Sequence, residues 1–318
     1  MTKIKTGLTL VILLTVLLNA YSQGCSDAGF CTMGAMKPDQ PFNKKIEFKL
    51  RSMEVSFYRA TTTLTPIIYV ATADMNFSIN RKTSFQVKLP YQAIQGRLAK
   101  TSGMGDISLC FTRSLYSKEK FDVNLSVGGK IPTNNSDKKT ADGNNLPMYY
   151  QTSLGTYDVI TGLSLISRKW LFATGIQVPL NKNNNQFLWN EWDHGHPEPD
   201  DSAYVHKYKN FNSKELKRGT DVMVRIERNW RLSRVNFSLG MLPIYRITRD
   251  EITDKNGNRV RPDKAQGLAM SVIFTTGYSF NVKSGIKLLL GHKLVQREVN
   301  PDGLTRHFVS TISYVYRF

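Results

Sequence analysis

The sequence predicts an all-β protein: a closed antiparallel transmembrane β-barrel of about 12 strands, preceded by a short N-terminal plug or tail segment. Three observations predict this fold. Segments with alternating apolar and polar residues follow one another from residue 43 to the end of the chain. The connections between these segments tend to alternate between short turns and longer loops. The chain ends on Tyr314-Val315-Tyr316-Arg317-Phe318, with aromatic residues at alternate positions up to the last one.

The composition excludes a membrane protein built from several helices. The chain has 318 residues, of which 41% are hydrophobic, and its mean hydropathy is −0.32. A helical bundle would need several apolar runs of about 20 residues each, whereas this sequence has a single such run, at the N-terminus. The composition does not exclude a membrane barrel, whose strands alternate apolar and polar residues and therefore look average in bulk.

Residues 1–22 have the pattern of a secretory signal peptide. Two lysines precede an uncharged apolar stretch at 8–18, and Ala20 and Ser22 supply the small residues of a cleavage site. A retained anchor helix and a lipoprotein attached through Cys25 are the alternatives. Cleavage would lower the formal charge of +18 by two, to +16, because the segment contains two lysines and no acid. That basic charge raises nucleic-acid binding as a function, but an exported protein does not meet cytosolic nucleic acid.

The exported part begins with the polar segment 23–42, which is too short to be a domain. Cys25 and Cys31 lie close together in it, and an oxidising compartment favours a disulfide between them. A metal site and two free thiols are the alternatives. The closed loop would enter the lumen as a small plug or remain a periplasmic tail tied to the rim. The third cysteine, Cys110, falls within a strand and is expected to be buried or to face the lumen.

The barrel is expected to occupy residues 43–318. Most of its alternating segments reach the 9–11 residues that a tilted strand needs to cross a membrane. Near Arg51 and Ser52 the alternation slips by one residue, which predicts a bulge. The twelve segments are 43–59, 64–79, 82–90, 104–116, 120–131, 152–167, 169–180, 216–230, 233–248, 266–280, 283–299 and 304–318.

The connections are sorted by length in the way that outer-membrane barrels sort theirs. Every second connection has one to three residues, and four of the intervening ones are much longer, at 91–103, 132–151, 181–215 and 249–265. Because twelve is even, both ends of the barrel fall on the periplasmic rim. The terminal Phe318 resembles the signal by which the barrel-assembly machinery recognises its substrates. A secreted soluble β-protein is the alternative fold.

Two stretches resemble a known family. Gly103-Met104-Gly105-Asp106-Ile107-Ser108-Leu109 is followed, after a short turn, by Val127-Gly128-Gly129-Lys130-Ile131-Pro132-Thr133-Asn134. Together they are similar to the outer-membrane barrels grouped as "MetA-pathway of phenol degradation" proteins, relatives of the long-chain fatty-acid channels. The match is close over about 83–134, and Asn134 stands where that family more often has glycine. The resemblance implies a barrel that passes small hydrophobic or aromatic compounds, and it assigns no binding residue.

The candidate site residues are polar side chains that the alternation places in the lumen. Opposite charges inside a barrel usually neutralise one another, and an excess of base would favour anionic solutes. Asp106 faces the lumen if Ile107 faces lipid. The lumen candidates are Glu47, Lys49, Asp106, Arg225, Glu227, Lys287 and Lys293.

Metal binding, catalysis and cofactors have little support in the sequence. His194, His196 and His206 lie in the longest loop near several carboxylates, but their spacing matches no zinc or EF-hand site. His292 and His307 are expected on adjacent strands, without a catalytic signature around them. No glycine loop of the phosphate-binding type is present. We therefore expect neither an enzyme nor a cofactor.

These inferences lead to two candidate functions. The first is an outer-membrane channel for passive uptake of small, hydrophobic or aromatic molecules, by loop capture and then diffusion through a constricted lumen or a lateral opening. The alternative is a non-transporting structural or accessory barrel subunit of an envelope complex. In either case the expected partners are outer-membrane lipid, lipopolysaccharide and the barrel-assembly machinery.

Overall fold

The structure is a computed structural model that describes residues 33, 49–62, 66–118, 120–189, 211–303 and 306–318. Strands account for nearly all of its regular structure, and the described part contains one short 3-10 helix at Met148–Tyr150. No helix among the described residues is long and apolar enough to cross a membrane.

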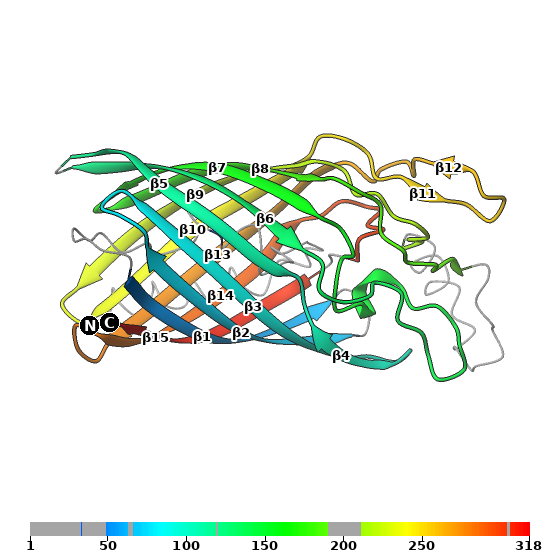
Figure 1. The fold of residues 1–318 in the computed structure, drawn as a ribbon, viewed down its shortest axis with the longest axis horizontal. Coiled ribbons are helices and arrows are strands. Elements are labelled where there is room, and N and C mark those ends of the chain that lie inside the picture. Colours follow the sequence, from blue (N-terminus) through cyan, green and yellow to red (C-terminus); the bar gives the residue numbers. More distant parts are fainter. Residues whose placement is uncertain (1–32, 34–48, 63–65, 119, 190–210, 304–305) are drawn as a thin grey trace, which may run out of the picture.

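The main sheet is a closed antiparallel barrel, as predicted (Figure 1). The sheet has thirteen strands but crosses the barrel wall twelve times. The reason is that β4 and β5 follow each other along the same partner, β3, and together make one crossing. A separate hairpin, β11 (Ile252–Thr253) and β12 (Arg259–Val260), stands in a loop. The wall strands are β1 (Lys49–Thr62), β2 (Ile67–Ser78), β3 (Thr83–Gln95), β4 (Lys100–Met104), β5 (Ile107–Ser117), β6 (Phe121–Ile131), β7 (Asp158–Ser167), β8 (Trp170–Pro179), β9 (Asp221–Leu232), β10 (Val235–Arg246), β13 (Gly267–Ser279), β14 (Ser284–Val295) and β15 (Arg306–Arg317).

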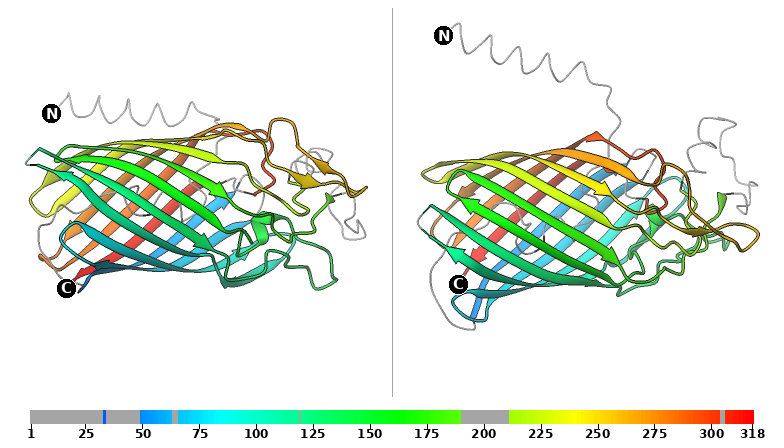
Figure 2. Two further views of the ribbon diagram at one scale, coloured as in Figure 1. Left: turned by 45° about the horizontal axis from the view of Figure 1, so that its top comes forward. Right: turned by 90° about the horizontal axis from the view of Figure 1, so that it is seen from above.

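The barrel closes where β1 pairs with β15, from Ser52 opposite Arg317 to Thr62 opposite Arg306. We call the end that carries the short turns and the C-terminus the short-turn rim, and the opposite end the loop rim. The long connections 132–157, 180–220 and 247–266 all leave the loop rim. Figures 1 and 2 show this sorting, with tilted strands between the two ends. In outer-membrane barrels the short turns lie on the periplasmic side, which is the side on which the sequence predicts both ends of this barrel.

Each strand shows one apolar face to the outside and buries the other. On β8, for example, Trp170, Phe172 and Ile176 are exposed, whereas Leu171 and Ala173 are buried. Aromatic pairs gather on the outside near the short-turn rim, as expected for an interfacial belt. These pairs are Tyr116–Phe121, Trp170–Phe172, Trp230–Phe237, Tyr278–Phe280 and Tyr316–Phe318.

Two details of the strands bear on the sequence predictions. The ladder between β1 and β2 shifts register between Leu50 and Ser52, where the alternation predicts a bulge. The expected loop at 91–103 is wrong, because β3 continues to Gln95 and β4 begins at Lys100. Gln92, Gln95, Lys100 and their neighbours are polar on both faces, so the alternation that marks a membrane strand is lost there.

Candidate functional site

The candidate site is the lumen together with the loops that fold over it. Three of the sequence-predicted residues, Arg225, Glu227 and Lys287, form ion pairs on its wall. Arg225 and Glu227, both about 1% exposed, form an ion pair of 2.6 Å on β9. The Nζ of Lys287 on β14 lies 3.8 Å from a carboxylate oxygen of Glu54 on β1. These pairs balance charge within the wall, which is the structural role that opposite charges inside a barrel usually have.

Asp106 is buried at the junction of β4 and β5, where it fixes the loop at 132–157. Its carboxylate lies 3.6 Å from Lys130 Nζ and accepts hydrogen bonds from Ser153 Oγ at 2.5 Å and the Leu154 backbone N–H at 3.1 Å. Lys130 is 2% exposed, so the pair is shielded from water. This arrangement ties the loop at 132–157 to the wall.

The remaining predicted residues are dispersed. Lys49 is exposed at the short-turn end of β1, opposite Ser78. Lys293 is fully buried near the loop end of β14 and donates a hydrogen bond to Gln296. The predictions that fall outside the described residues concern the cysteine pair, one lumen carboxylate and the loop histidines: Cys25, Cys31, Glu47, His194, His196 and His206.

The middle of the lumen carries an apolar belt that the sequence predictions missed. Its members lie on seven strands, β5, β7, β8, β9, β10, β13 and β14, and form one cluster on the inner wall, where a water-filled porin has polar side chains. Cys110, the free cysteine among the described residues, belongs to it. The belt residues are Cys110, Ile160, Ala173, Met223, Leu242, Ile244, Ile273 and Leu289.

Met33 packs into this belt. It is the one described residue that precedes β1, and it is 1% exposed. A Cβ atom placed on Gly128 of β6 would lie 3.0 Å from the Met33 methyl carbon, so the side chain also touches the wall between the belt strands. A residue from the N-terminal part of the chain therefore packs against the apolar belt inside the barrel.

Above the belt, loop residues form an apolar cap against the inner wall at the loop rim. Tyr149 and Phe211, which come from two different loops, meet edge to face with ring centres 5.2 Å apart. The Tyr150 hydroxyl accepts a hydrogen bond from the Leu98 N–H at 3.1 Å. The loop cap consists of Leu146, Tyr149, Tyr150, Phe187, Trp189 and Phe211, and it packs on Ile68, Val70 and Ile94 of the wall.

A buried charge network holds the other loops in place, with Arg246 at its centre. The guanidinium donates all five of its N–H groups, to Asp221 (2.8 and 2.7 Å), Asp250 (2.9 and 2.8 Å) and Asp302 (2.8 Å). Arg297 lies 3.6 Å from both Asp221 and Asp302. These residues join β9 and β10 to the loops that follow β10 and β14.

The network shifts the pKa values of its two loop carboxylates, Asp250 and Asp302, in opposite directions. Burial raises the pKa of Asp250, and the negative charge of Asp302 acts in the same direction. Burial alone would also raise the pKa of Asp302, but Arg246, Arg297 and Arg218 together hold it well below its usual range. Asp302 is therefore the firmly ionised partner of Arg246. Its neighbour Gly303 has φ +68° and no room for a Cβ beside Tyr149, so the network also packs against the loop cap.

His292 and His307 lie side by side on β14 and β15, with ring centres 5.2 Å apart. No group of three His, Cys, Asp or Glu side chains gathers as metal ligands would in the described part of the chain.

The belt could have been suspected from residues 241–244, where Met-Leu-Pro-Ile is apolar on both faces. The charge network could not, because its members are separated by long stretches of sequence.

No family model and no curated protein match the chain. Among solved structures, the COG4313 outer-membrane channel from Pseudomonas putida F1 is similar over 88% of this chain and 99% of that one, with a TM-score of 0.63 and 13% identity. The NanC porin (84% and 100% covered, TM-score 0.45, 8% identity) and the CymD monoaromatic hydrocarbon channel (95% and 99%, 0.42, 11%) resemble it less. The first similarity supports the fold of an outer-membrane barrel.

Proposed function

We propose that this protein is an outer-membrane channel for passive uptake of small hydrophobic or aromatic molecules, and that its N-terminal segment closes the lumen at Met33. The observation that carries the proposal is the apolar belt across the middle of the barrel. A belt of this kind lowers the free energy of an apolar solute in transit and raises that of a hydrated ion or sugar. The similar P. putida structure is itself described as an outer-membrane channel. The family resemblance of residues 83–134 implies that the solute is a small hydrophobic or aromatic compound.

The passage begins at the loop cap, where aromatic side chains would capture an apolar solute. Displacement of Met33 then opens the belt, and the solute leaves at the periplasmic side of the lumen. In this proposal residues 1–22 are a signal peptide, residues 23–42 are the plug with its Cys25–Cys31 disulfide, and the C-terminal strand ending at Phe318 is recognised by the barrel-assembly machinery.

Entry of an apolar dye into whole cells tests the channel, because a lipopolysaccharide leaflet admits apolar dyes slowly. We expect expression of the protein to speed entry of a fluorescent naphthylamine severalfold. The double variant Leu242→Asp, Ile273→Asp places two carboxylates on the belt and is expected to abolish this gain. Ser238→Asp with Thr275→Asp adds the same charge to the inward faces of the same strands outside the belt, and it is expected to retain the gain.

The alternative, a barrel subunit that transports nothing, draws on the same packing of Met33 and the loop cap, which narrows the lumen from both sides. Under this alternative, dye entry would be the same with and without the protein. An increase in dye entry on expression of the full-length protein would rule the alternative out, whereas deletion of residues 23–42 tests only whether that segment plugs the lumen.

A further inference from the structure

The short-turn rim carries a ring of positive charge that the channel proposal does not use. Each of the five short turns contains at least one lysine or arginine, and Arg317 adds another at the end of β15. The sequence places a single acid, Glu119, in these turns. We call the following nine residues the basic rim: Arg81, Lys82, Lys118, Lys120, Arg168, Lys169, Arg234, Lys283 and Arg317.

The nine charges are available to an external partner. Eight of the side chains are exposed, and Arg317 is half-buried. None of the nine forms an ion pair with another residue in the described part of the chain. Nine like charges around one rim repel one another, so an anionic partner would relieve a cost that the fold otherwise carries.

The loop rim has many cations too, and several of them are paired with acids of the same rim. Lys182 lies 2.8 Å from Glu215, and Lys264 lies 2.8 Å from Glu298. Arg261 lies 2.6 Å from Glu251, and this neighbour lowers the pKa of the Glu251 carboxyl. The two ends of the barrel therefore differ: several loop-rim cations have an acidic partner, whereas none of the nine cations of the basic rim forms an ion pair in the described part of the chain.

The height of the basic rim on the barrel indicates what the partner is. Arg228 stands on the outer surface of β9 with its guanidinium 4.9 Å from the Trp170 ring centre and 5.9 Å from that of Trp230. Lys118 Nζ lies 5.5 Å from the ring centre of Tyr116. Trp and Tyr mark the level of the lipid headgroups, so these cations stand where phosphates of the leaflet are found.

The distribution of the charges favours lipid over a docked protein. The basic rim follows the turns around the whole circumference, and no turn lacks a cation. A single protein partner would need a patch on one side, whereas a surrounding shell of headgroups meets every turn.

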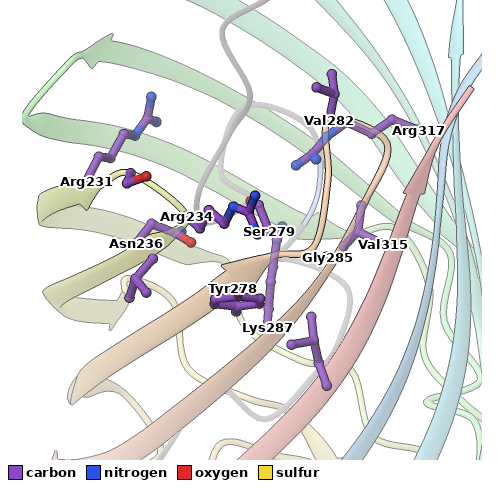
Figure 3. Close-up of a pocket in the computed structure, with 13 residues that line it drawn as sticks. Arg231, Arg234, Asn236, Tyr278, Ser279, Val282, Gly285, Lys287, Val315 and Arg317 are labelled. Carbon is purple, nitrogen blue, oxygen red and sulfur yellow. The ribbon is translucent and has the colours of Figure 1, made fainter.

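One place on the rim is hollowed as a headgroup site would be. A cavity of about 290 Å³ lies between the turns that join β9 to β10 and β13 to β14 (Figure 3). Three arginines, Arg231, Arg234 and Arg317, line it, together with Lys287, whose Nζ lies 3.8 Å from Glu54 on the inner wall. Val235, Val282 and Ile286 lie beside them. Cations next to apolar side chains suit a phosphate that continues into an acyl chain, and suit a free ion less well.

We propose that the basic rim binds the phosphodiester headgroups of anionic phospholipids in the inner leaflet, with the cavity at Arg234 and Arg317 as its deepest site. Such lipids are attracted by roughly a factor of five per cation close to the surface at low salt. The proposal depends on the barrel and its orientation and is independent of what the channel carries.

The two rim tryptophans can report on this binding. The full-length protein, with Trp189 and Trp192 replaced by phenylalanine so that Trp170 and Trp230 remain, is reconstituted in phosphatidylcholine vesicles. Quenching by brominated phosphatidylglycerol is compared with quenching by brominated phosphatidylcholine. We expect roughly fivefold tighter association of the glycerol lipid, and a weaker preference in about 0.5 M salt, where charges are screened.

The matched variants separate the basic rim from overall charge. Arg168→Glu, Lys169→Glu and Arg234→Glu together are expected to remove the preference. Lys100→Glu, Lys139→Glu and Lys255→Glu change three exposed loop-rim cations by the same total charge and are expected to keep it. Equal quenching by both lipids in the parent protein would overturn the proposal, as would a preference that survives the rim variant. Displacement of the lipid by soluble glycerol phosphate would also overturn it, because the site would then serve a free anion.

Discussion

Replacement of Met33 by aspartate is expected to increase the conductance of the reconstituted barrel by a large factor. The methionine is buried in the apolar belt, so loss of its packing costs roughly 2–3 kcal/mol. A carboxylate held there without a partner costs several kcal/mol more. Every 1.4 kcal/mol shifts an equilibrium about tenfold. The equilibrium constant for keeping the segment in its bound position therefore falls by roughly a hundredfold or more, and the lumen opens.

Single-channel recordings in planar bilayers measure this effect. Met33→Leu keeps the apolar volume of the side chain and is expected to conduct as the parent protein does. A chain that lacks residues 23–42 is expected to match Met33→Asp. If Met33→Asp and Met33→Leu conduct equally, Met33 does not close the lumen. Because all three proteins keep the barrel strands unchanged, the comparison does not depend on differences in folding.

Replacement of Arg246 by alanine is expected to have the largest effect on stability. All five N–H groups of Arg246 are bonded to three carboxylates, and its side chain is fully buried. Removal of one partner from a buried ionic cluster usually costs about 3–5 kcal/mol, because the remaining charges stay buried without compensation. Urea unfolding of the barrel in lipid vesicles measures the loss, and limited proteolysis shows whether the loop at 247–266 is released.

Arg249 supplies the control for this experiment. It stands three residues further along the same loop, and its pair with Asp263 is largely exposed at 3.1 Å. Exposed pairs contribute about 0–1 kcal/mol, so Arg249→Ala is expected to unfold nearly as the parent protein does. Arg246→Lys keeps the charge but offers three donors where five are bonded. Its loss of unfolding free energy is expected to lie between those of Arg249→Ala and Arg246→Ala. Equal losses in Arg246→Ala and Arg249→Ala would contradict a structural role for the network.

The barrel was predictable from sequence because a membrane strand must be apolar on one face and can be polar on the other. This constraint produces a clear alternation in strands such as Asp221–Leu232 and Ser284–Val295. The alternation ends where the chain leaves the membrane. This explains why residues 91–103, where β3 pairs with β4, were expected to form a loop. The bulge near Arg51 was visible because a one-residue slip exchanges the two faces.

The interior of the candidate site was predictable only in part. The alternation predicts that Asp106, Arg225 and Glu227 face inward, but it says nothing about which residues meet. Arg246 and Asp302 join only through the closed barrel and the return of its loops. The belt residues are apolar, so the pattern alone cannot separate them from residues that face lipid. Closure of the barrel is what turns these separate signals into a site.

Pairing of the first wall strand with the last one makes assembly of this barrel all-or-none. Even the final residue takes part, because the Phe318 N–H donates to the Arg51 carbonyl across the seam at 3.0 Å. A chain that stops short of β15 would leave β1 and β14 with open edges, which in a lipid environment expose unsatisfied backbone groups. The seam therefore makes closure of the barrel depend on its last strand: without β15, β1 has no partner that completes the wall.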